Sequence, residues 1–240
     1  DYVVASGDLT RRAKPRQFRA ARSWLQALDR PVLAVPGNHD VPMYRFWERL
    51  LVPYGAWRKH YCKELEPRLG DDEVALVGVN SATNFVISGG KVTPRSRERM
   101  VAAFAGVNGD AYRIAVLHHN LFRPPDLEDV PRPPRTSTAT LDALARAEVD
   151  LVLGGHSHQS FYGRSPVAPA GGRRPALLLY AGTASCSRGR GVEKGQNTCH
   201  WLEVDGAGVT VGFWRWSPQA ETFVEERRET FPRWEEGRDG

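Results

Sequence analysis

The sequence predicts an α/β fold, and three observations support this prediction. Short apolar runs typical of buried strands occupy residues 3–6, 32–35, 114–117 and 151–153. A helical stretch over 14–29 joins the first two runs, with Phe18, Ala21, Leu25 and Leu28 at helical spacing. Each run is also followed closely by polar residues, three times with a glycine. Strands that alternate with helices form α/β sheets, which place their sites where the strands end.

The remaining elements follow from the same kinds of pattern. We expect helices at 42–51, 95–104 and 140–147, and strands at 73–80, 176–181, 198–204 and 208–216. The last two strands alternate like a hairpin around Asp205-Gly206. Five prolines make 123–135 a loop, which is either a rigid surface connection or a wall over the site. The polar tail, 225–240, is expected to fray.

Residues that commonly bind metal ions follow four of the apolar runs. In chain order these residues stand in Gly7-Asp8, Gly37-Asn38-His39-Asp40, His118-His119 and Gly155-His156-Ser157-His158. Strand ends of one sheet meet at one edge, so these side chains are expected to converge. A mixed set of carboxylate, amide and imidazole ligands suits Mn, Fe, Zn or Co, whereas Ca or Mg favours oxygen alone.

This pattern resembles the calcineurin-like metallophosphoesterase family, whose signature comprises Asp-x-His, Gly-Asp, Gly-Asn-His-Asp/Glu, a strand-end His and Gly-His-x-His. The resemblance implies one domain over 1–240, a four-layer α/β/β/α sandwich of two mixed sheets flanked by helices. The opening Asp-x-His is not in this sequence, which begins at Asp1. We therefore expect an N-terminally truncated domain that lacks the family's first strand–helix unit.

The resemblance also assigns a role to each matching residue. Asp8 would bridge two metal ions; Asn38, His118 and His156 would complete the shell of one ion, and His158 would bind the other. His39 would contact the phosphoryl oxygens and protonate the leaving group, with Asp40 orienting it. His118 matches the usual ligand position, although Asn120 stands where relatives carry Pro, and His119 is the alternative ligand.

The function that the resemblance implies is hydrolysis of a small phosphoester, a diester or a monoester, by attack of metal-bound hydroxide. Small bacterial phosphodiesterases of the cyclic-nucleotide type are most similar, because they share the His118-His119 pair and the loop Gly182-Thr183-Ala184-Ser185. Arg188 or Arg190 in that loop either meets the substrate or is an ordinary surface arginine. The alternative function is a catalytically impaired binding or scaffold domain, which the missing Asp-x-His keeps open.

Composition narrows the class of protein. The 240 residues, 41% of them hydrophobic, suffice for one core, and no apolar stretch approaches the roughly 20 residues that cross a bilayer. The net charge of +5 is spread among acidic residues, so a small anionic substrate is expected rather than nucleic acid. Three cysteines without metal-finger spacing indicate a reduced, cytoplasmic protein. The sequence indicates no organic cofactor, and His60 and His200 are expected to be structural or surface residues.

Overall fold

The centre of the fold is a six-stranded sheet. The computed structural model describes residues 1–240 except 86–88, 128, 166–174 and 234–240. The strand order is β3 (Arg68–Gly70), β4 (Val74–Gly78), β5 (Tyr112–Val116), β6 (Leu151–Gly154), β8 (Leu177–Tyr180) and β7 (Phe161–Arg164). The four inner strands are parallel, and β3 and β7 add antiparallel edges. Inner strands covered on both faces are continuously apolar, which is why these runs could be recognised in the sequence.

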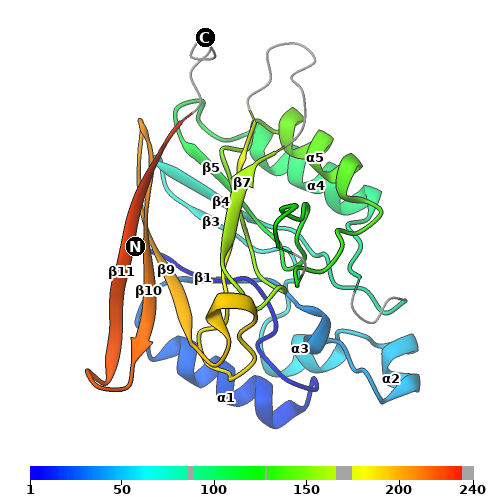
Figure 1. The fold of residues 1–240 in the computed structure, drawn as a ribbon. Coiled ribbons are helices and arrows are strands. Elements are labelled where there is room, and N and C mark those ends of the chain that lie inside the picture. Colours follow the sequence, from blue (N-terminus) through cyan, green and yellow to red (C-terminus); the bar gives the residue numbers. More distant parts are fainter. Residues whose placement is uncertain (86–88, 128, 166–174, 234–240) are drawn as a thin grey trace.

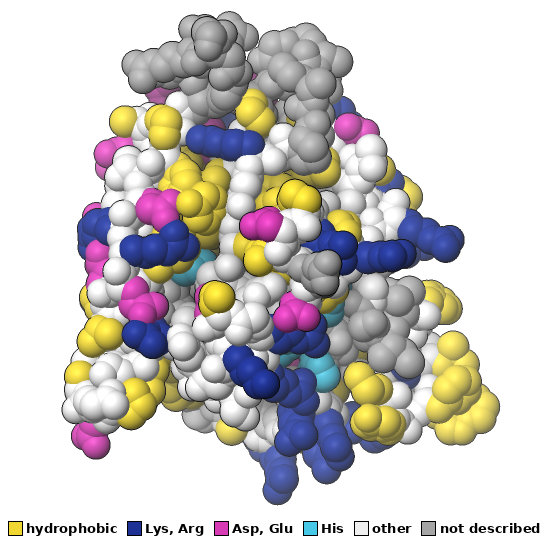
Figure 2. All heavy atoms as spheres, in the orientation of Figure 1, with side chains coloured by type: hydrophobic (Ala, Val, Ile, Leu, Met, Phe, Trp, Pro, Cys, Tyr) yellow, Lys and Arg dark blue, Asp and Glu magenta, His cyan; other side chains and the backbone are white. Residues whose placement is uncertain are grey.

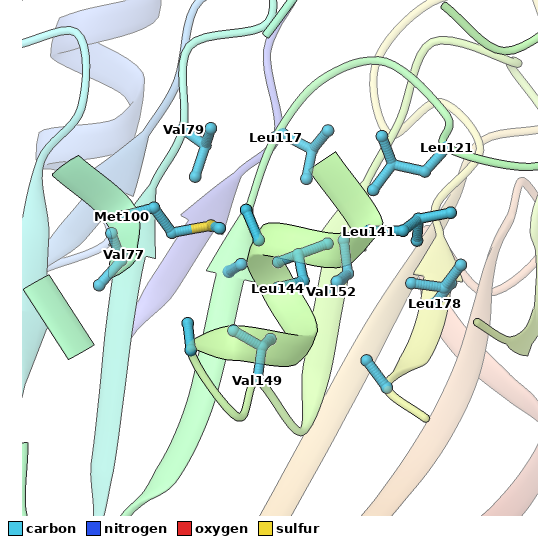
Figure 3. Close-up of a cluster of buried hydrophobic side chains, with 14 of the residues drawn as sticks. Val77, Val79, Met100, Leu117, Leu121, Leu141, Leu144, Val149, Val152 and Leu178 are labelled. Atoms are coloured by element: carbon cyan, nitrogen blue, oxygen red, sulfur yellow. The ribbon is translucent and has the colours of Figure 1, made fainter. Parts of the chain in front are cut away.

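Two helices cover one face of this sheet. They are α4 (Pro94–Ala105) and α5 (Ser137–Arg146). Pro94 occupies the first turn of α4, and the Thr93 hydroxyl caps it by accepting from Ser96 N at 3.1 Å. Figure 3 shows the core between helices and strands, where Met100, Leu141 and Leu144 meet Val152 and Leu178.

A second layer of strands packs on the opposite face. It contains the parallel pair β1 (Val3–Ala5) and β2 (Val32–Ala34) and the antiparallel strands β9 (Thr198–Asp205), β10 (Gly208–Ser217) and β11 (Thr222–Pro232). Leu33 and Val211 from this layer share one apolar cluster with Ile114 of the central sheet. Phe18 of α1 (Pro15–Gln26) and Trp57 of α3 (Gly55–His60) cover the outer face of β1 and β2. The order is therefore helix, sheet, sheet, helix, and the predicted four-layer sandwich is confirmed (Figure 1).

The prediction of a frayed tail over 225–240 is wrong for most of the described residues in that range. The chain from Glu225 continues as part of β11 to Pro232, while 234–240 lie outside the described residues. β11 pairs antiparallel with β10, and its charges are matched across the surface, as in the ion pairs of Arg228 with Glu203 and Glu225. The predicted hairpin of β9 and β10 is confirmed, with Asp205 Oδ1 accepting from the amides of Ala207 and Gly208.

Two further differences concern the surface near the strand ends. The helix expected at 42–51 is shorter, since α2 covers Phe46–Leu51, and a 3₁₀ turn occupies Asn38–Asp40.

No helix among the described residues is long and apolar enough to cross a membrane.

Candidate metal centre

Predicted ligands from both strand layers converge at the strand ends. Asp8 follows β1 and Asn38 follows β2, whereas His118 and His156 follow β5 and β6 of the central sheet. His118 Nε2 lies 3.1 Å from Asn38 Oδ1 and 3.4 Å from Asp8 Oδ1. His156 Nδ1 lies 3.1 Å from the same Asn38 oxygen. The structure thus brings together four residues that span most of the sequence.

The orientation of His118 makes this group suitable for a cation. His118 Nδ1 lies 2.8 Å from the carbonyl oxygen of Ser6. A carbonyl can only accept, so Nδ1 carries the hydrogen, and Nε2 of the neutral ring presents a lone pair. That lone pair faces the oxygens of Asn38 and Asp8, and three acceptor atoms at one point repel one another unless a cation lies between them. The residues present therefore fit a transition-metal ion, with a backbone carbonyl fixing the imidazole as is usual for metal ligands.

His119 is held in the opposite tautomer. Ser81 Oγ accepts from the amides of His118 and His119, both at 3.2 Å, which leaves its single hydrogen to donate to His119 Nδ1 at 2.9 Å. The neutral ring then carries its proton on Nε2, which is buried and has no hydrogen-bond partner among the described residues. Burial, together with His118 and His156, lowers the pKa of His119 well below its usual value. Ring nitrogens of His118, His119 and His156 all lie within 4.8 Å of one another, but the hydrogen bonds favour His118 over His119 as a ligand.

Three of the predicted ligands lie on left-handed backbone. The φ angles are 55° at Asp8, 71° at His156 and 58° at His158. Residues with a Cβ rarely adopt this conformation, and such strain is concentrated at functional sites. Burial and the neighbouring His118 lower the pKa of His156 to about 3, so the ring is neutral at neutral pH and can offer a lone pair. His158 is half-buried. Burial lowers its pKa below the usual value, and this effect outweighs the opposing effect of the charge on Asp8.

His39 stands beside these residues, but its ring partner differs from the one expected. The His39 amide donates to Asp8 Oδ1 at 2.9 Å, and its ring Nδ1 lies 3.1 Å from the carbonyl oxygen of Arg11. The ring Nε2 lies 3.2 Å from Arg188 Nη1. The backbone of Arg11, rather than Asp40, is therefore the group that orients the imidazole.

Asp40 instead joins the two turns that carry the predicted ligands Asp8 and Asn38. Its carboxylate accepts from the amides of Leu9 at 3.1 Å, Thr10 at 2.8 Å and Gly37 at 3.0 Å. The amides of Thr10 and Gly37 are buried and need acceptors, and a carboxylate between the turns satisfies all three. Burial and the nearby charge of Asp8 raise the pKa of Asp40 to about 7, against the lowering effect of the amides.

Sequence reasoning missed some contributors to this site. Ser81 had a signal, because it directly follows the strand predicted at 73–80. The carbonyls of Ser6 and Arg11 had no such signal, since every residue has a carbonyl.

The proline-rich loop is held by Asn120, whose Nδ2 donates to Pro131 O at 2.8 Å. A separate open groove of about 660 Å³ is lined by Lys14, Pro15, Arg16, Arg19, Arg45, Glu48 and Ala56 and contains none of the predicted site residues.

Comparison with known proteins agrees with this arrangement. A family described as calcineurin-like phosphoesterase matches residues 1–160. A probable cyclic nucleotide phosphodiesterase from Synechococcus is 26% identical over 168 residues, which cover 67% of this chain and 59% of the relative. The glycerophosphodiester phosphodiesterase GpdQ from Enterobacter lignolyticus is 48% identical over 72 residues, covering 30% of this chain and 21% of the relative. The matched stretches thus span less than two thirds of either relative.

Solved structures support the fold. A dimetal phosphatase from Danio rerio superposes with a TM-score of 0.64 at 12% identity, covering 97% of this chain and 84% of the other. GAP50 from Plasmodium gives a TM-score of 0.60 at 13% identity, covering 98% and 79%. With a family match over residues 1–160 of 240, the same four-layer fold and predicted ligands that converge at the strand ends, the chain belongs to the calcineurin-like phosphoesterase family.

Proposed function

We propose that the chain hydrolyses a small phosphoester with the help of bound transition-metal ions, and that phosphodiesters are the first substrates to test. The observation that carries this proposal is the convergence of lone pairs from Asp8, Asn38 and His118 at 3.1–3.4 Å. The names of the two relatives, a cyclic nucleotide phosphodiesterase and a glycerophosphodiester phosphodiesterase, favour diesters. A pair of such ions, when bound, supplies an activated water and neutralises charge on the phosphoryl group.

Each side chain at the candidate centre has a separate proposed role. Asp8 would be a ligand to both ions; Asn38, His118 and His156 would hold one of them, and His158 would hold the other. His39 gives a proton to the leaving oxygen from Nε2, while the Arg11 carbonyl fixes its ring through Nδ1. Asp40 fixes the turns that carry Asp8 and Asn38 relative to each other, because it accepts hydrogen bonds from amides of both turns.

The test compares a ligand variant with an acid variant. We expect metal-dependent hydrolysis of phosphodiesters by the full chain after loading with Mn, Fe, Zn or Co. His156→Ala should lose both bound metal and activity on every substrate, because a ligand is removed. His39→Ala should keep its metal but lose about 10²–10⁴-fold in rate on a poor leaving group, and much less on nitrophenol, which needs little protonation.

The control is His60→Ala, since His60 lies at the end of α3 and makes no contact with the predicted ligands. Metal content is measured by elemental analysis, and rates are measured by release of the leaving alcohol or nitrophenol from diesters and of phosphate from monoesters. Equal metal loss in His39→Ala and His156→Ala would make His39 a ligand and refute the assigned roles. A wild-type chain that binds metal yet turns over neither diesters nor monoesters would instead favour the binding or scaffold function.

A further inference from the structure

We propose that an apolar face and a basic rim, which adjoin each other beside α1 and α2, dock the chain on a bilayer that contains anionic lipids. The apolar face comprises residues 44–52, with α2 (Phe46–Leu51) at its centre. The basic rim comprises Lys14, Arg16 and Arg19 in the first turns of α1. The chain would lie on this bilayer rather than cross it, and the proposal does not rest on the proposed function.

The helix α2 turns its arginine toward the protein and its apolar side chains toward solvent. The buried guanidinium of Arg49 donates at 2.7–3.1 Å to three backbone carbonyls, those of Pro42, Thr83 and Asn84. At 100° per residue, the apolar side chains lie on an arc of about 140° and are 45–71% exposed: Phe46, Trp47, Leu50 and Leu51. Arg49 fixes the helix, so packing within the chain does not explain why this arc is apolar.

The apolar face is large for the surface of a single chain. Tyr44, Phe46 and Trp47 are 75%, 65% and 71% exposed, and the rings of the last two meet edge to face with centroids 5.4 Å apart. An aromatic side chain has about 150–250 Å² of surface, so these three leave about 300–550 Å² in water, and the exposed aliphatic residues 50–52 enlarge this area. The largest apolar patch on a typical monomer covers about 300–600 Å² and is often functional, so the apolar face indicates a partner.

The basic rim adjoins this face. The open groove of about 660 Å³ reaches α2, because Arg45 and Glu48 line it together with Lys14, Arg16 and Arg19. Glu48 pairs with Arg45 at 2.8 Å, whereas no carboxylate of the described residues lies within ion-pair distance of the basic rim. In Figure 2, hydrophobic side chains gather at the lower right, where Figure 1 places α2, and Lys and Arg side chains gather beside them at the bottom. The charge next to the apolar face is therefore positive.

This combination of side chains favours an anionic bilayer over a second copy of the chain. Aromatic and leucine side chains insert at the level of the lipid headgroups, and neighbouring Lys and Arg are attracted to anionic lipids. Arg12 joins the two kinds of side chain, because its guanidinium lies 5.6 Å from the centre of the Tyr44 ring. A twofold interface would instead bring the surface against itself and place the like charges of two basic rims in one contact.

The test measures sedimentation of the full chain with vesicles of phosphatidylcholine alone or in equal mixture with phosphatidylglycerol. We expect clear preference for the mixed vesicles, and binding that weakens as salt screens the charges. Trp47→Gln should lower the affinity for mixed vesicles by at least about tenfold, which corresponds to about 55 Å² of apolar area left in water. Its control is Trp201→Gln, because Trp201 is 59% exposed on β9, away from α2, and this variant should bind like wild type (Figure 1).

A second pair of variants tests the basic rim. Arg16 and Arg95 are both exposed, and each directly follows the proline that opens a helix of 12 residues, α1 or α4. Arg16→Gln should weaken binding to mixed vesicles by about fivefold, the effect of one charge near an anionic surface, and Arg95→Gln should not change it. Circular dichroism checks that each variant is folded.

Three outcomes would overturn the proposal. They are equal binding to both kinds of vesicle, wild-type binding by Trp47→Gln, and wild-type binding by Arg16→Gln. The oligomeric state is measured in parallel by sedimentation velocity. A chain that ignores vesicles but forms a dimer that Trp47→Gln dissociates would assign the apolar face to a second copy, and the bilayer proposal would be wrong. The vesicle assay needs neither bound metal nor turnover, so its result is independent of whether the chain is a hydrolase.

Discussion

Gly7 offers a direct test of how the backbone builds the candidate metal centre. Its φ is +101°, a conformation that residues with a Cβ rarely adopt. A Cβ added there would lie 2.5 Å from His118 Nδ1 and 2.9 Å from the Gly37 amide nitrogen. Gly7→Ala therefore forces the His118 ring away from the Ser6 carbonyl that sets its tautomer.

The expected cost has two parts. The left-handed backbone costs about 1–2 kcal/mol for a residue with a Cβ, and the overlap adds about 1–3 kcal/mol, as in other overpacked sites. The sum, about 2–5 kcal/mol, is within the stability of an ordinary domain, so the variant should still fold. Its affinity for metal should fall by about 10–100-fold, because a carbonyl that orients a ligand is disturbed.

Alanine variants at two other glycines distinguish the backbone cost from the cost of steric overlap. Gly195 has a φ of +74° and open space around its Cβ position, so Gly195→Ala should show the backbone cost alone. Gly109 has neither a left-handed φ nor a close neighbour, and Gly109→Ala should be nearly neutral. Urea unfolding gives the stabilities, and metal titration gives the affinities. If Gly7→Ala matched Gly195→Ala in both, the reasoning about His118 would be refuted.

Two further predictions concern buried polar groups. Ser81→Ala leaves two amides and His119 Nδ1 without their buried partner, so the free energy of unfolding should fall by about 3 kcal/mol or more; a loss below about 1 kcal/mol would show that these bonds are not formed. Burial and Arg227 lower the pKa of His200 to about 4. Between pH 6.5 and 4 the unfolded chain binds a proton at this residue that the folded chain does not, so stability should fall with decreasing pH by up to about 3 kcal/mol. Urea unfolding across this range should show a smaller dependence in His200→Gln, and parallel curves for the two proteins would contradict the argument.

The sequence predicted the four inner strands of the central sheet, but not its edge strands β3 and β7, because only strands covered on both faces leave a simple pattern. A strand covered on both faces, such as β6 (Leu151–Gly154), is apolar throughout, and this signal is independent of distant residues. β11 (Thr222–Pro232) has no such signal. Its run of acidic and basic residues reads as a solvated tail until β10 is known to lie beside it, where Arg227 covers the Phe213 ring at 3.7 Å. Charged edge strands are protected against aggregation, but they look like loops in a sequence.

The candidate site was predictable in its side chains and not in its backbone partners. Ligands at strand ends can be inferred from order alone, since parallel strands carry Asp8, Asn38, His118 and His156 to one region. The hydrogen bonds that choose a tautomer come from the Ser6 and Arg11 carbonyls and from Ser81. Their action depends on the exact path of the chain, and only the fold supplies that path. The role expected for Asp40 differed for the same reason, because three backbone amides donate to its carboxylate.

The left-handed backbone at Asp8, His156 and His158 has a consequence for how this fold can lose its chemistry. Each of these residues occupies a conformation that glycine adopts without strain, at a difference of about 1–2 kcal/mol. Selection that acts only on folding would therefore not preserve these side chains. At the half-buried His158 it would favour a substitution by glycine. Inactive descendants of such a protein can be more robust than their active ancestor. The backbone geometry at these three positions thus lowers the cost of replacing their side chains with hydrogen.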